Sequence, residues 1–244
     1  MLKKLTILLL VLSIIIACTA CGFKKQTNSA ENKKDIENTE AADGGWEITD
    51  NKAAKLPEEV QAAFNKAIKH FTGSKLKPAA YIASQVVAGT NYMILCEAET
   101  TTEKPVKSYQ MAIVYADLKG NAKLTSIKDF DLAAYTEGNN TEISGEQLAG
   151  GWTVPDDAVG SVISREAKDA FDKATRQFTG SDIEPLALLG TQVVAGTRYA
   201  FICKSTLTTK EPVSGIQIVT VYADLKGNAE ITNISTIDPA DFNE

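Results

Sequence analysis

Histidine is nearly absent from this chain: its 244 residues contain a single one, His70. Serine and cysteine hydrolases use histidine as their general base, and catalytic zinc sites use it as a ligand. The sequence also contains no cysteine and histidine pairs at metal-ligand spacing. These absences exclude the usual catalytic triads and metal sites, so we expect no enzyme activity, no catalytic residue, no metal and no cofactor.

Long apolar runs are also scarce, and the longest one lies at the very start, from Leu5 to Ala17. At about 1.5 Å per helical residue, this run is too short for a hydrocarbon core roughly 30 Å thick. Lys3 and Lys4 precede it. A short basic segment followed by a short apolar one is typical of a signal peptide, which we place at residues 1–17.

Cysteine is rare, but two of the four cysteines follow this segment directly. The sequence "IIAC" resembles the lipobox of bacterial lipoproteins, which implies acylation of Cys18. The overlapping "CTAC" implies Cys21 instead, and an ordinary cleaved signal without lipid is a third alternative. Acyl chains would hold the exported protein on the outer face of a membrane of the bacterial cell envelope, at about 0.8 kcal/mol per buried methylene.

Basic residues are outnumbered by acidic ones, 25 to 31, which gives a net charge of -6. Removal of residues 1–17 takes away two lysines and no acid, so the charge becomes -8. An acidic exported protein is not expected to bind nucleic acid. Residues 18–43 are polar, charged and poor in apolar side chains, which predicts a disordered tether.

The rest of the chain is a tandem repeat. "VYADLKGNA" occurs at 114–122 and again at 221–229, "FTGS" at 71–74 and 178–181, and "GGW" at 44–46 and 150–152. Two copies of a unit of this length predict two domains, 44–134 and 150–244, joined by a linker at 135–149. Cys96 and Cys203 stand at equivalent positions, where we expect small buried side chains; the alternative is a disulfide between the repeats, which would require these two interior positions to meet.

Each copy predicts one helix followed by strands. Val60, Phe64, Ala67 and Phe71 form an apolar stripe after Pro57, and Ser164 is the expected N-cap of the second helix. Alternation predicts strands near 79–84, 90–100, 109–116 and 123–127 in the first copy. The predicted fold class is therefore α+β, with one helix packed on a twisted four-stranded antiparallel sheet, duplicated in tandem.

The hexapeptide "QVVAGT" stands between the first two long strands of both copies. It resembles the QxVxG loop of the cystatins, which inhibit papain-like cysteine proteases, and the first copy's "TNY" resembles the stefin-type members. In that family a glycine segment and two hairpin loops form a wedge that fills the protease cleft. The resemblance implies a glycine segment at Gly44, Gly45, Gly150 and Gly151, a first loop at Gln85, Val86, Val87, Ala88, Gly89, Gln192, Val193, Val194, Ala195 and Gly196, and a second loop at Leu118, Lys119, Gly120, Leu225, Lys226 and Gly227.

One part departs from the family pattern. Many secreted cystatins carry Pro-Trp in the second loop, whereas this chain has "DLKGN", without an aromatic residue. Stefin-type members also lack that tryptophan. The predicted function is a monomeric, lipid-anchored, reversible inhibitor of papain-like cysteine proteases. The alternative is a non-inhibitory adhesion or ligand-binding lipoprotein on the same scaffold, in which the hexapeptide is only a turn. The inhibitor hypothesis requires the three segments of a copy to converge on one edge.

Overall fold

The structure, a computed structural model, describes residues 44–50, 56–136, 151–155 and 163–243, which belong to one compact unit, Ala41–Glu244. Several predicted features lie outside the described residues: the signal peptide, the tether, both candidate acylation sites at Cys18 and Cys21, Gly150, and residues 137–149 of the linker. The first two linker residues, Tyr135 and Thr136, belong to a short helix, α2 (Leu132–Thr136).

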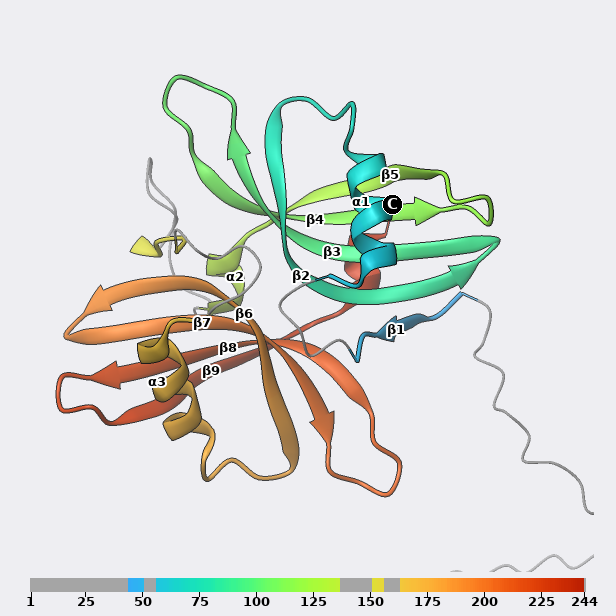
Figure 1. Ribbon diagram of the computed structural model, residues 1–244. Helices are drawn as coiled ribbons and strands as arrows, with labels where there is room; N and C mark the ends of the chain where they lie inside the picture. Colours follow the sequence, from blue (N-terminus) through green and yellow to red (C-terminus); the bar gives the residue numbers. More distant parts are fainter. Residues whose placement is uncertain (1–43, 51–55, 137–150, 156–162, 244) are drawn as a thin grey trace, which may run out of the picture. The chain divides into compact units, whose positions relative to one another are not determined.

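The first copy forms a five-stranded antiparallel sheet whose strands are neighbours in chain order (Figure 1). Helix α1 (Glu58–Ala67) lies between the first and second strands in the sequence. The strands are β1 (Trp46–Ile48), β2 (Ser74–Val87), β3 (Gly89–Thr100), β4 (Lys107–Ala116) and β5 (Ala122–Phe130).

The second copy forms a four-stranded antiparallel sheet, again in chain order. Its helix is α3 (Arg165–Thr175), and a 3-10 helix, η2 (Pro239–Phe242), follows the last strand. In place of a strand equivalent to β1 there is a single bridge between Thr153 and Thr191. The strands are β6 (Ser181–Val194), β7 (Gly196–Leu207), β8 (Ser214–Asp224) and β9 (Ala229–Ile237).

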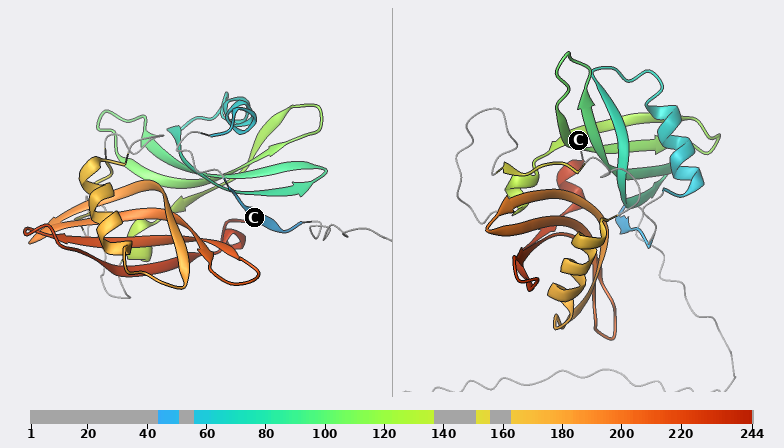
Figure 2. Two further views of the ribbon diagram at one scale, coloured as in Figure 1. Left: turned by 60° about the horizontal axis from the view of Figure 1, so that its bottom comes forward. Right: turned by 60° about the vertical axis from the view of Figure 1, so that its left-hand side comes forward.

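Helices α1 and α3 each lie across one face of their own sheet (Figure 2). Val60 and Phe64 of α1 are buried in a cluster with Ile94 and Cys96 of β3. Phe171 of α3 is buried in the matching cluster of the second sheet. Spacings of three and four residues place such side chains on one helix face, which is why the sequence predicted these helices.

The predicted N-cap is confirmed. The backbone N–H of Ala167 donates to the Ser164 hydroxyl over 3.2 Å, which satisfies one of the amides left unpaired at the start of α3. Helix α1 begins after Pro57 without a side-chain cap, with Glu58 and Glu59 in its first turn. The apolar stripe of the sequence is longer than either helix, because the helices end at Ala67 and Thr175.

The predicted fold class is wrong. The described residues are mostly strand, in antiparallel sheets of five and four strands with only a few short helices. The strand predicted near 79–84 is longer in the structure and includes Pro78, which cannot donate to a ladder. In the structure β2 continues through it by a register shift between Pro78 and Ala80, so the strand is 14 residues long.

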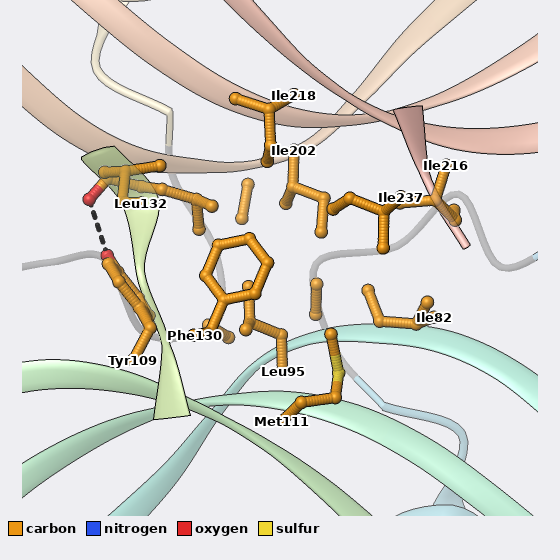
Figure 3. Close-up of a cluster of buried hydrophobic side chains, with 14 of the residues drawn as sticks. Ile82, Leu95, Tyr109, Met111, Phe130, Leu132, Ile202, Ile216, Ile218 and Ile237 are labelled. Carbon is orange, nitrogen blue, oxygen red and sulfur yellow. Dashed lines mark hydrogen bonds between the residues drawn. The ribbon is translucent and has the colours of Figure 1, made fainter. Parts of the chain in front are cut away.

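The sheet faces that the helices leave free are buried in a shared core (Figure 3). Because strand side chains alternate, Ile94 points toward α1 while Leu95 enters this second core. Ile82 and Met111 of the first sheet lie in the same cluster as Ile202 and other buried residues of the second. The Tyr109 hydroxyl donates to the backbone carbonyl of Leu189 over 2.7 Å.

The short helical segment that follows each sheet contacts the sheet of the other copy. The Asn233 carboxamide on β9 donates to the carbonyl of Tyr135 in α2 over 2.7 Å. At the equivalent position of the first sheet, the Ser126 hydroxyl on β5 donates to the carbonyl of Phe242 in η2 over 3.4 Å. Each terminal segment therefore packs on the other copy.

Candidate functional site: a hairpin edge in each repeat

The first hairpin ends in an exposed apolar tip. Val86 is 56% exposed and Val87 41%, and Ala88 is exposed between β2 and β3. Gly89 closes the turn with a φ of 139°. A Cβ at this glycine would lie 2.3 Å from the carbonyl oxygen of Ala116, so the close approach of β3 to β4 requires glycine here.

The second hairpin loop lies beside this tip, at the same end of the first sheet (Figure 1). Tyr115 joins the two, because its hydroxyl donates to the carbonyl of Ala88 over 2.6 Å. Leu118, Lys119 and Gly120 are exposed in the loop, with Leu118 88% exposed.

Asp117 holds the second loop in shape. Its carboxylate accepts the backbone N–H of Lys119 and of Asn121, each over 2.8 Å, and also the Asn121 carboxamide over 2.8 Å. Bonds to Asn121 favour the ionised form and lower the pKa of the Asp117 carboxyl.

The glycine segment meets the base of the same hairpin. The Gln85 carboxamide donates to the carbonyl of Gly44 over 2.6 Å, and Asn91 donates to the Gln85 carboxamide oxygen over 2.7 Å. Gly44 and Gly45 are exposed, and Gly44 has a φ of 104°. Gln85 therefore connects the segment to the hairpin, and all three predicted segments converge on one edge.

The second copy repeats the tip and the second loop, while Gly150 lies outside the described residues and Gly151 is exposed with a φ of 72°. Val193 is 86% exposed and Val194 45%, and Ala195 is exposed beside them. Gly196 has a φ of 141°, and the Tyr222 hydroxyl donates to the carbonyl of Ala195 over 2.7 Å.

The second loop of this copy is arranged in the same way. Leu225, Lys226 and Gly227 are exposed, and Asp224 accepts the backbone N–H of Lys226 and of Asn228, each over 2.8 Å. Hydrogen bonds from Asn228 lower the pKa of the Asp224 carboxyl.

The two edges differ beside the glycine segment. Trp46 is half-buried, and its indole N–H donates to the Asn243 carboxamide over 3.0 Å. Trp152 is 3% exposed, and the Arg198 guanidinium lies over its ring at 5.6 Å. Arg198 also donates to Gln192 over 3.0 Å, so this arginine takes the place that Asn91 has in the first copy.

The resemblance did not identify several residues that hold the edges in shape, among them Tyr115, Tyr222, Asp117 and Asp224. The available signal was the "YADLKGNA" segment, identical in both copies. Leu118 to Gly120 and their equivalents stay predicted contact residues, and the neighbouring tyrosine and aspartate hold the loops in shape.

Other kinds of site find little support in the part of the chain that the structure describes. These residues contain no group of three or more His, Cys, Asp or Glu that could hold a metal ion. Cys96 and Cys203 are free and buried, as predicted, and burial raises the pKa of both thiols. No helix among the same residues is long and apolar enough to cross a membrane.

Comparison with known proteins assigns no family. No family model matches the chain, and no curated protein matches it. Among solved structures it has a weak likeness to an "Ntf2 like protein involved in plasmid conjugation", with 8% identity over 76% of this chain and 91% of that one. The TM-score is 0.21, so this likeness supports neither a shared fold nor a function.

Proposed function

We propose that this protein is a reversible inhibitor of papain-like cysteine proteases that acts by occluding the substrate cleft and is displayed by a lipid anchor outside a bacterial membrane. The observation that carries the proposal is the convergence of three segments on one edge: the glycine segment at Gly44, the tip at Val87 and the loop at Leu118. The cystatin resemblance of "QVVAG" supplies the partner class.

The edge has the physical properties that occlusion needs. Its exposed aliphatic side chains, including Val86 and Leu118, would gain roughly 25 cal/mol for each Å² of apolar surface buried in a cleft. The hydrogen bonds of Tyr115 and Gln85 hold the tip before binding, so little conformational entropy is lost on docking. No nucleophile is needed, because the inhibitor only has to fill the site.

The test is inhibition of papain by the chain from Thr19 onward, with a variant that carries Val87→Asp and Val194→Asp. We expect inhibition at micromolar concentration or below, and a loss of at least about tenfold in the variant, because each aspartate removes apolar contact surface from the tip and carries a charge that must lose its water on docking. Val106→Asp with Val213→Asp is the matched control, since both valines are 62% exposed in the loops between β3 and β4 and between β7 and β8.

The control double variant should inhibit as the wild type does. If the wild-type chain inhibits no papain-like protease at micromolar concentration, the inhibitor proposal is wrong, and the scaffold alternative of a non-inhibitory adhesion or ligand-binding lipoprotein takes its place.

A further inference from the structure

A groove of about 430 Å³ opens on the first edge, next to the exposed tip. Trp46, Val87 and Tyr115 supply its apolar walls, and Lys123 lies on its rim. Among the described residues that line it, Lys123 is the only charged one. The groove therefore combines aromatic and aliphatic surface with one positive charge.

Most polar groups of the groove other than Lys123 have hydrogen-bond partners within the protein. The hydroxyls of Thr125 and Ser126 donate to backbone carbonyls of Ile113 and Phe242. As described above, the Trp46 indole and the carboxamide of the lining residue Asn91 also have partners.

The Lys123 ammonium is different. It is exposed, and among the described residues it lies over the ring of Tyr115, with 5.7 Å from the nitrogen to the ring centre. A ring face leaves the three N–H donors of an ammonium available for an acceptor. We infer that the groove binds a carboxylate carried on an apolar stem, with the carboxylate at Lys123 and the stem between Trp46 and Val87.

The occupant that this chemistry fits is an acidic side chain of the protein bound at the first edge, and this assignment rests on the proposed function. Val87 both lines the groove and belongs to the tip, so a partner that covers the tip also reaches the groove. The contact would be a charge-assisted hydrogen bond partly shielded from water by the aromatic walls.

The second edge does not repeat this chemistry. Lys123 pairs with Tyr115 across β4 and β5, and the equivalent residue opposite Tyr222 is Glu230. Trp152, the counterpart of Trp46, is buried beneath Arg198. The preference for an acidic side chain therefore belongs to the first edge alone, so the edges of the two copies bind surfaces of different charge.

The experiment uses 3-phenylpropionate as the anionic probe and 3-phenylpropanamide as its neutral match, added to the chain from Thr19 onward without any protease. Amide and indole resonances are followed by NMR. We expect saturable shifts at Trp46, Lys123 and Ser126 with the carboxylate, and at least about tenfold weaker binding of the amide, because only the anion gains the charged contact.

Lys123→Met should weaken binding of the carboxylate about tenfold, which brings it close to the amide. Lys104→Met is the matched control, because it removes the same charge from an exposed position in the loop between β3 and β4 and should leave the titration unchanged. Resonances of the shared core report whether each variant is folded. Equal binding of the two probes, or unchanged binding in folded Lys123→Met, would overturn the groove proposal.

Papain inhibition by the same variants separates the two proposals. Inhibition without carboxylate binding would contradict the groove proposal and support the inhibitor proposal. Carboxylate binding without inhibition would support the groove proposal and contradict the inhibitor proposal. When a protease is bound, the probe should no longer shift the Lys123 resonance. A bound protease that leaves the groove open to the probe would overturn the assignment of the occupant.

Discussion

Gly89 and Gly196 are the residues at which each hairpin turns close to its neighbouring strand. Both have φ near 140°, a region that side chains with a Cβ rarely adopt, and both face a backbone carbonyl at 2.3 Å from the position of a Cβ. Sequence alone explains a glycine in a turn. The contact with Ala116 explains why no other residue fits at Gly89.

Gly89→Ala should lower the free energy of unfolding by about 2–3 kcal/mol, because strain and a backbone clash act together. Urea denaturation measures this. Gly73 has a φ of 105° and no atom near the position of a Cβ, so Gly73→Ala introduces backbone strain without a clash. It should lower the free energy of unfolding by only about 1 kcal/mol. Gly215→Ala, without a positive φ or a nearby atom, should change little. Equal costs at the three positions would contradict this explanation.

Asp117 makes the second loop sensitive to acid. Its folded-state pKa is lowered, chiefly by the Asn121 side chain, so the ionised carboxylate stabilises the loop at pH values above the usual aspartate range. This stabilisation is lost as the pH falls through the lowered pKa. Amide exchange at Lys119 and Asn121, corrected for its intrinsic pH dependence, should show increased loop opening in that range.

The control for this loop is Asp117→Asn, which cannot ionise and should open to the same extent at every pH. A carboxyl NMR titration of Asp117 in the usual range, or an acid response that persists in Asp117→Asn, would show that the carboxylate does not hold the loop.

At the scale of elements, the edge depends on hydrogen bonds between hairpins. The hydroxyl of Tyr115 on β4 holds the tip between β2 and β3, and the hydroxyl of Tyr222 on β8 holds the tip between β6 and β7. The helices cover the sheet face opposite the shared core, and one lysine of each also holds the second loop: Lys66 donates to the carbonyl of Gly120 over 2.7 Å and Lys173 to that of Gly227 over 3.0 Å. The position of the tip is therefore decided by strand register and by these two hydroxyls.

Tyr115→Phe should increase amide exchange at the tip and cost about 1 kcal/mol of stability, because the carbonyl of Ala88 loses its partner. Under the proposed function, inhibition should weaken severalfold through the loss of preorganisation. Tyr81→Phe serves as the comparison, since Tyr81 lies in the α1 cluster away from the tip. An unchanged tip in Tyr115→Phe would show that the hydroxyl is dispensable.

At the scale of the whole molecule, the two copies share one buried core. Ile82 and Ile202 lie in the same cluster although they come from different sheets. The α2 and η2 segments add contacts between the copies. We therefore expect both copies to unfold in a single cooperative transition.

Ile82→Ala tests this cooperativity, and a cost of about 3 kcal/mol is expected for a large-to-small change in a core. Hydrogen exchange should then increase equally at strongly protected amides of β3 and of β7. Val106→Ala, at an exposed position, should affect neither sheet. Faster exchange confined to β3 would mean that the copies are independently stable.

The sequence by itself determined the repeat, the two long helices, the N-cap at Ser164 and the exposed glycine turns, because these depend on local periodicity and on residue-specific backbone preferences. Only the tertiary structure decided the five-stranded and four-stranded sheets, the shared core and the groove at Lys123. The three-residue strand β1 forms because it pairs with the edge of β2. Strand β2 continues past Pro78 because the register shifts between Pro78 and Ala80. The groove exists because Trp46 and Asn243, far apart in the chain, meet beside the hairpin that pairs Tyr115 with Lys123, a proximity that no local pattern encodes.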